Sequence, residues 1–94
     1  MVYNGEKMKF KGKFVLKKLS DFYAVVPVED SVNKFNCMIT LNESGALLWE
    51  TLGHGADEKD LIAALKGEYS VDDATAEKDV AVFLEQLKNA DIIE

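Results

Sequence analysis

The hydrophobic pattern of this chain changes its period once, near residue 42, and this change limits the possible folds more than any other feature. In residues 35–41 apolar and polar residues alternate, as in a strand with one buried face. Beyond residue 42 apolar residues recur at helical spacings, as in amphipathic helices. The sequence therefore predicts strands first and helices second.

The first half contains signals for three strands. Residues 14–19 and 22–28 are rich in β-branched and aromatic residues, and Ser20 and Asp21 between them favour a turn. The third candidate strand is residues 35–41, where the alternation predicts one covered face. We expect a three-stranded antiparallel sheet.

The second half contains start signals for three helices. Asn42, Asp57 and either Ser70 or Asp72 are candidate N-caps, each followed by an amphipathic stretch. We expect the apolar tail at residues 92–93 to pack on the core or to join the sheet. The result is an α+β, winged-helix-like fold in which the sheet is followed by a three-helix bundle. The apolar stripe of the third helix consists of Ala76, Val80, Phe83, Leu84 and Leu87.

Length and composition predict one small domain. Of 94 residues, 48% are hydrophobic, enough for a single core at residues 14–94, with a basic arm or fraying strand at residues 1–13. No membrane-length apolar run or secretory signal is present, so we expect a cytoplasmic protein. A single cysteine, Cys37, and a single histidine, His54, provide neither an internal disulfide nor a zinc site, and we expect no cofactor.

Charge is divided unevenly along the chain, whose net charge is -6. Residues 1–42 contain seven lysines and four acidic residues, whereas residues 43–94 contain four lysines and thirteen acidic residues. The chain has no arginine, and both later helices are acidic, which disfavours DNA binding by a winged helix. For the lysines of the N-terminal arm, we favour a solvated, weakly ordered terminus over a steering patch for an acidic partner.

The sequence contains no set of residues typical of an enzyme. We find no nucleophile elbow, phosphate-binding glycine loop or paired metal ligands. His54 lies between two glycines and is interpreted as an ordinary loop residue, and Cys37 as a small core residue. We therefore expect a protein without catalytic activity.

An exposed strand edge would give such a domain a function. Unpaired N–H and C=O groups on an edge accept an added strand, and a neighbouring helix supplies a groove for its side chains. The alternative is that these side chains simply form the core. The candidate peptide-binding residues come from the third strand and the third helix, and they are Phe35, Cys37, Met38, Ile39, Val80, Phe83, Leu84 and Leu87.

Residues 14–93 resemble the PqqD family, named for a protein of pyrroloquinoline quinone biosynthesis. The resemblance depends on Leu-Asn-Glu-Ser-Gly at residues 41–45, Leu48-Trp49, the Leu61 to Leu65 spacing with Tyr69, and the stretch from Asp79-Val80 through Phe83-Leu84 to Leu87. Most of these are packing residues, which are more typical of a fold family than of an activity.

The resemblance implies a recognition element for ribosomally made, modified peptides. Such modules hold the leader segment of a precursor peptide as an added strand beside the third strand and third helix. They present it to a modifying enzyme, commonly a radical S-adenosylmethionine maturase. Two other interpretations stay open, a DNA-binding winged-helix regulator and a structural subunit that dimerises through the same edge. We expect a monomer or weak dimer that binds no nucleic acid or membrane.

Overall fold

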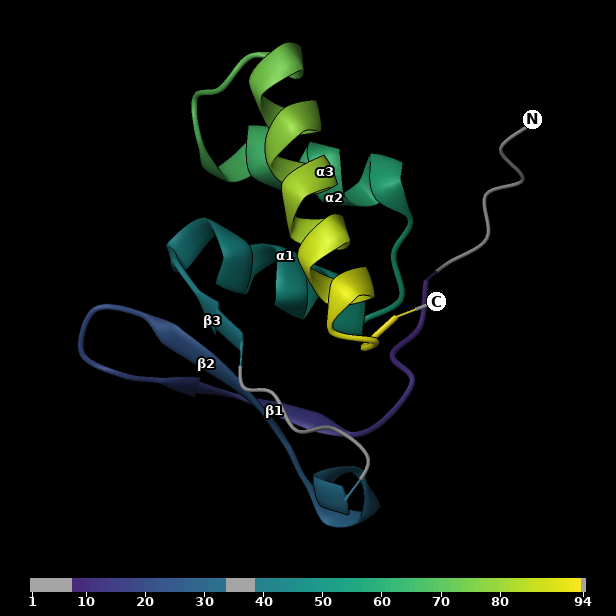
Figure 1. Ribbon diagram of the computed structural model, residues 1–94. Helices are drawn as coiled ribbons and strands as arrows, with labels where there is room; N and C mark the ends of the chain where they lie inside the picture. Colours follow the sequence, from purple (N-terminus) through teal and green to yellow (C-terminus); the bar gives the residue numbers. More distant parts are fainter. Residues whose placement is uncertain (1–7, 34–38, 94) are drawn as a thin grey trace.

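The computed structural model describes residues 8–33 and 39–93, in which a three-stranded antiparallel sheet precedes three helices (Figure 1). This confirms the predicted α+β order. In Figure 1 the helices lie together on one side of the sheet. The elements are β1 (Phe14–Lys18), β2 (Tyr23–Pro27), a short 3-10 helix η1 (Glu29–Asn33), β3 (Ile39–Leu41), α1 (Glu43–Gly53), α2 (Glu58–Glu68) and α3 (Asp73–Asn89).

The sheet has the strand order β1-β2-β3, so β3 is one of its two edges. Both strand pairs are antiparallel, and Thr40 lies opposite Ala24. Ile39 and Leu41 are buried while Thr40 is exposed, which confirms the predicted alternation within β3. The remainder of the predicted third strand, at residues 35–38, lies outside the described residues.

All three helices begin where local sequence signals place their caps. The side chains of Asn42, Asp57 and Asp72 each accept a hydrogen bond from the backbone N–H three residues later, at 2.8 Å. These bonds satisfy donors that the first helical turn leaves without partners. The predicted caps at Asn42 and Asp57 are confirmed, and of the two candidates for the third helix Asp72 is the cap.

Gly45 permits a close approach between α1 and β3. A Cβ atom at this position would lie 3.1 Å from the Cβ of Leu41 and 3.2 Å from Oδ1 of Asn42. Glycine therefore lets the first turn of α1 pack directly on the end of the strand. This contact holds the turn by which the chain passes from β3 into α1.

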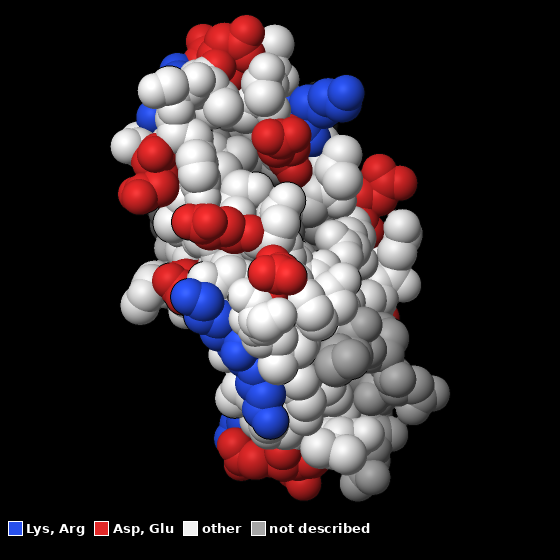
Figure 2. Space-filling model, turned by 90° about the vertical axis from the view of Figure 1, so that its left-hand side faces the viewer, with Lys and Arg blue, Asp and Glu red and all other residues white. Residues whose placement is uncertain are grey.

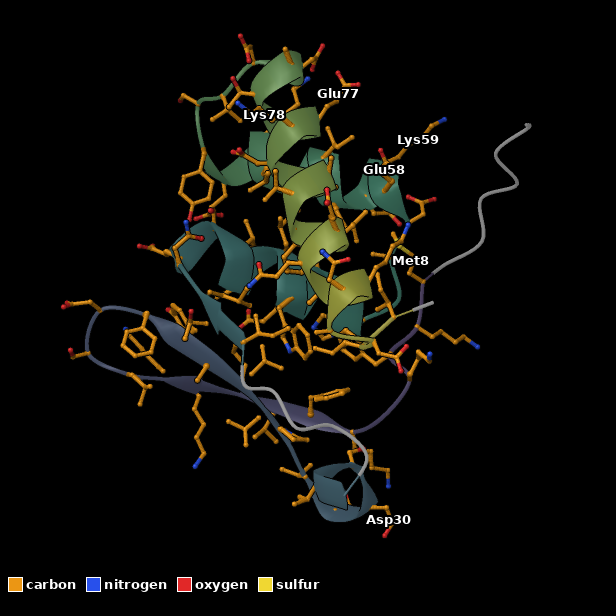
Figure 3. All side chains as sticks on the ribbon, viewed as in Figure 1. Met8, Asp30, Glu58, Lys59, Glu77 and Lys78 are labelled. Carbon is orange, nitrogen blue, oxygen red and sulfur yellow. The ribbon has the colours of Figure 1, made fainter. Side chains whose placement is uncertain are left out.

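The N-terminal arm, residues 8–11, is tied to the domain by backbone hydrogen bonds. The Met8 N–H donates to the Ala56 carbonyl at 2.8 Å, and the Lys11 N–H donates to the Ile92 carbonyl at 2.7 Å. Figure 3 shows Met8 near the start of α2, where Glu58 and Lys59 are labelled. The arm thus connects the α1–α2 link to the end of the chain.

Aromatic packing strengthens this attachment. The ring of Phe10 stacks on Trp49 of α1 with a centroid separation of 4.2 Å, and Phe14 packs edge-on against both rings. The expectation of a solvated, weakly ordered terminus is therefore wrong for residues 8–11. The alternating lysines favour a solvated segment, but Phe10 between two of them packs on Trp49 and holds the segment on the domain.

The end of α3 turns the chain back toward the core. The Asp91 N–H donates to the Lys88 carbonyl at 3.0 Å and the Ile92 N–H to the Leu87 carbonyl at 2.9 Å, the two bonds of a Schellman motif. Asp91 has a φ of 62° and occupies the left-handed position that this motif requires. The turn buries residues 92–93, as expected for the apolar tail.

The core lies between the sheet and the helices, and none of the described helices has the length and apolar character needed to cross a bilayer. Trp49 and Phe83 contribute aromatic rings to it. Its largest fully buried side chains are Leu48, Leu61, Leu65, Leu87, Ile92, Ile93, Val25 and Val80.

Candidate functional site

The residues of β2 that point their backbone N–H and C=O groups toward β3 determine which residues of β3 are paired and which point their backbone groups away from the sheet. The Val28 N–H donates to the Lys13 carbonyl at 2.9 Å, so Val28 faces the β1 side. Because successive residues of a strand point their backbone groups to opposite sides, Tyr23 and Val25 face β3. Pro27, which has no N–H, falls on that same side and removes no bond from the β1–β2 ladder.

Thr40 therefore presents its N–H and C=O to the open side of β3. It lies opposite Ala24, whose backbone groups face β1. The Gln86 side chain of α3 reaches this edge, with Nε2 donating to the Thr40 carbonyl at 3.5 Å. No other described residue donates to that carbonyl, and no described segment extends the sheet beyond β3. The predicted free edge is present in the part of β3 that the structure describes.

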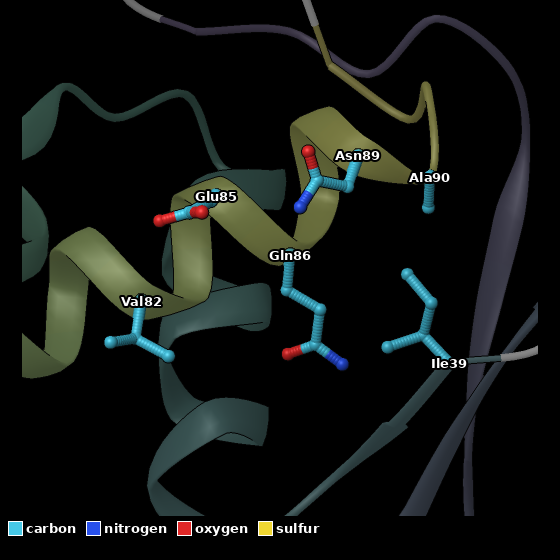
Figure 4. Close-up of a pocket in the computed structure, with 6 residues that line it drawn as sticks. All are labelled: Ile39, Val82, Glu85, Gln86, Asn89 and Ala90. Carbon is cyan, nitrogen blue, oxygen red and sulfur yellow. The ribbon is translucent and has the colours of Figure 1, made fainter.

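Two adjoining hollows lie between this edge and α3, and we call them together the edge groove. The first, of about 630 Å³, is drawn in Figure 4, where Gln86 extends from α3 toward the strand. The two hollows share Val82 and Gln86. The first is lined by Ile39, Val82, Glu85, Gln86, Asn89 and Ala90. The second is lined by Thr40, Leu41, Asn42, Ser44, Gly45, Leu48, Asp79, Val82, Phe83 and Gln86.

The structure brings only some of the predicted peptide-binding residues to the edge groove. Ile39 lines its first hollow and Phe83 its second, although both are mostly covered. Val80 and Leu87 are 0% exposed and Leu84 is 7% exposed, and all three lie in the core and line neither hollow. The other predicted residues, Phe35, Cys37 and Met38, lie outside the described residues.

The α3 wall of the edge groove is a face of the helix that sequence reasoning missed. It follows Asp79, Val82, Gln86 and Asn89, which recur at helical spacing beside the core stripe. Val82 is the clearest signal, because at 59% it is the most exposed of the large hydrophobic side chains that the structure describes. An apolar residue among polar neighbours marks such a second face.

Negative charge borders the edge groove. Glu85 lines the first hollow and Asp79 the second, and neither forms an ion pair with a described lysine. Figure 2 shows acidic side chains spread over the upper, helical part of one face and a line of basic side chains below them. Within residues 8–33 and 39–93, no group of three or more His, Cys, Asp or Glu side chains is placed to hold a metal ion.

Comparisons with known proteins find one family model and a solved structure that match this chain. The model of the family described as coenzyme PQQ synthesis protein D (PqqD) matches residues 23–93. A solved structure titled "TbiB1 in Complex with the TbiA(beta) Leader Peptide" superposes with a TM-score of 0.74 at 26% sequence identity, covering 93% of this chain and 95% of that one. No curated protein matches the sequence. The match to TbiB1 spans the sheet and the helices alike.

Proposed function

The chain belongs to the PqqD family, and from this premise we propose that it is a non-catalytic module that binds the leader segment of a ribosomally made precursor peptide. In this proposal the module presents the leader to an enzyme that modifies the rest of the precursor. The fold it shares with TbiB1, a protein solved with a leader peptide, supports the assignment.

The observation that carries the proposal is the outward-facing backbone of Thr40 beside the edge groove. An extended peptide that pairs with Thr40 gains ladder hydrogen bonds through its backbone. Its alternate side chains then enter the hollows on either side of Val82 and Gln86. A peptide N–H then donates to the Thr40 carbonyl in place of Gln86 or beside it, because a carbonyl oxygen has two lone pairs.

Among the described residues, the hydrogen bond from Gln86 is the one that reaches the outward backbone of Thr40, and it is weak enough to be exchanged. The 3.5 Å separation of Nε2 and the carbonyl oxygen is at the long limit of a hydrogen bond, and the group is exposed to water. Such a bond contributes at most about 0.5–1 kcal/mol. A peptide that forms two or more ladder bonds replaces it with a net gain.

The enzyme that receives the peptide is part of the same proposal. We take it to be a radical S-adenosylmethionine maturase, the partner that the family implies, and we place the module in the cytoplasm with its substrate. The acidic groove-facing residues Asp79 and Glu85 argue against the alternative of DNA binding, because phosphate would be repelled there. Edge-to-edge dimerisation remains an outcome of the test below.

Nuclear magnetic resonance titration of the full chain tests the proposal. The probe is a synthetic peptide covering the first half of any short open reading frame found beside the gene. We expect micromolar or tighter binding, with amide shifts concentrated in residues 35–41 and 76–87. Unmoved amides there, with such a peptide in excess, would contradict the proposal. Sedimentation without peptide separates it from dimerisation, which would persist on dilution.

A further inference from the structure

A third hollow continues the edge groove past the end of β3, and we call it the terminal hollow. Its volume is about 330 Å³. It shares Asn42, Ser44 and Asp79 with the second hollow of the edge groove, so the two adjoin. The lining residues of the terminal hollow are Asn42, Glu43, Ser44, Leu65, Tyr69, Val71 and Asp79.

Three chain segments meet to form this hollow. Glu43 begins α1, immediately after the Asn42 cap. Tyr69 ends α2 in an extended conformation with φ of −125° and ψ of 149°, and the chain then passes through Val71 toward α3. Leu65 is buried and both Tyr69 and Val71 are half-buried, so the floor of the hollow is apolar. Asp79 closes it from the middle of α3.

The rim of the terminal hollow is negatively charged. Glu43 and Asp79 are exposed, and neither forms an ion pair with a described lysine. Partial burial raises the pKa of the Tyr69 hydroxyl above its ordinary value, and the carboxylates of Glu43 and Glu68 raise it further. Tyr69 therefore stays neutral at physiological pH.

The start of α1 does not neutralise this rim. The N-terminus of a helix carries the equivalent of about half a positive charge. Two carboxylates exceed it by about one and a half negative charges. An apolar floor with a surplus of negative charge at its rim fits a side chain that is aliphatic along its length and cationic at its end.

We propose that the terminal hollow is a second subsite for the bound peptide and that it accepts a lysine or arginine side chain of the leader. This inference rests on the proposed function. The aliphatic stem lies on Leu65, Tyr69 and Val71, and the cationic group reaches Glu43 and Asp79. The subsite adds a charge requirement to a groove that otherwise selects apolar side chains.

The geometry of α3 sets the spacing of this residue within the peptide. Asp79 and Ala90 mark the two ends of the combined groove, and at 1.5 Å per residue they are about 16 Å apart along the helix. An extended peptide covers that distance with about five residues. The basic residue therefore lies about five positions from the apolar residue that contacts Ile39. It precedes that residue if the peptide runs antiparallel to β3 and follows it if the peptide runs parallel.

Selection from a display library of random peptides of about twelve residues tests the spacing without knowledge of the natural leader. The library is selected against the full chain, against the double variant Glu43→Gln/Asp79→Asn, and against the control Glu58→Gln/Glu77→Gln. The control removes the same charge, and Figure 3 shows Glu58 at the start of α2, away from the start of α1. We expect lysine or arginine at the stated spacing with the wild type and the control, and not with the double variant.

Failure of the subsite is distinguishable from failure of the proposed function. Equal enrichment of basic residues with all three proteins, or none with any, overturns the subsite while the peptides still bind. The proposed function predicts that selected peptides bind the wild type and not the Thr40→Pro variant. If no peptide with this behaviour is recovered, the proposed function itself is overturned. Circular dichroism of each variant verifies that the helices are retained.

A measurement with one selected peptide isolates the charge. Replacing its basic residue by methionine keeps the length of the stem and removes the cation. We expect the wild type to bind the methionine peptide about two- to fivefold more weakly, as for an exposed ion pair, and the Glu43→Gln/Asp79→Asn variant to bind both peptides equally. An unchanged preference in that variant would overturn the subsite.

Discussion

Two short segments lie beside the C-terminal half of α3. The N-terminal arm pairs with one of them, and no described backbone segment pairs with the other. Residues 92–93 are covered by the chain's own arm, through the Lys11 N–H on the Ile92 carbonyl and a bridge between Phe10 and Ile93. The outer side of β3 is met only by the side chain of Gln86 among the described residues. We call these the closed margin and the open margin.

The difference between the margins is a difference in how easily each is exchanged. The arm that covers the closed margin is held by backbone bonds to Ala56 at 2.8 Å and to Ile92 at 2.7 Å and by the stack of Phe10 on Trp49, so opening this margin loses packing and hydrogen bonds together. The open margin loses one long bond. The closed margin therefore contributes to stability, and under the proposed function the open margin accepts the peptide.

The largest effect is expected from Thr40→Pro at the open margin. Proline removes the outward N–H, so the peptide carbonyl that would accept from it is left without a partner. It removes no hydrogen bond to β2, because Thr40 faces away from that strand. We expect at least about 30-fold weaker peptide binding by calorimetry, with the helical circular dichroism spectrum retained.

Thr40→Ala is the matched control for the proline variant. It removes the side chain, which is exposed, and keeps the backbone N–H. We expect its affinity to stay within about twofold of the wild type. Weak binding by the alanine variant, or normal binding by a folded proline variant, would mean that the open margin does not act through its backbone.

The second effect tests the closed margin. Phe10→Ala removes the ring that stacks on Trp49 and contacts Phe14. We expect the free energy of unfolding in urea to fall by about 3 kcal/mol. Peptide affinity of the folded protein should not change, because Phe10 lines neither hollow of the edge groove. Loss of affinity without loss of stability would show that the two margins are coupled.

The helix caps and the apolar stripe of α3 that enters the core could be predicted because both depend on local sequence. Asn42 and Asp57 are short polar residues directly before amphipathic stretches, and their side chains cap the helices as expected. The strand alternation is equally local, and the predicted covered face of β3 is the one that carries Ile39 and Leu41.

Two features could not be predicted because they depend on contacts between distant segments. Phe10 finds Trp49 and Ile93 only after the chain has folded, and no local pattern links them. The groove wall depends on how α3 lies against β3. Apolar periodicity identifies the face of a helix that enters the core, as it did for Val80, but a groove is formed by the neighbouring face that stays outside.

The third effect compares the two faces of α3 through a pair of valines. Val80 is 0% exposed, and Val82 is 59% exposed and lines both hollows of the edge groove. We expect Val80→Ala to lower the free energy of unfolding by about 2 kcal/mol and to leave affinity unchanged. Val82→Ala should leave stability within about 0.5 kcal/mol and weaken peptide binding by about threefold. If Val80→Ala weakened peptide binding and Val82→Ala did not, the apolar stripe of α3 would form the binding wall instead.

The smallest effect is expected at the start of α3, away from both margins, where the cap Asp72 titrates. Hydrogen bonds from the Thr75 side chain and backbone N–H lower the pKa of Asp72 below its ordinary value of 3.8. A carboxyl group with a lower pKa in the folded state stabilises that state above pH 3.8, and this contribution is lost as the pH falls through the folded pKa.

Asp72→Asn keeps an oxygen that accepts the cap hydrogen bond but removes the charge. We therefore expect the wild type to have the higher melting temperature at pH 6 and the difference to shrink as the pH falls below 3.8, through the lowered pKa of the folded state. A difference that does not shrink would assign the effect to the shape of the cap, and a change in peptide affinity at pH 6 would mean that the start of α3 is coupled to the open margin.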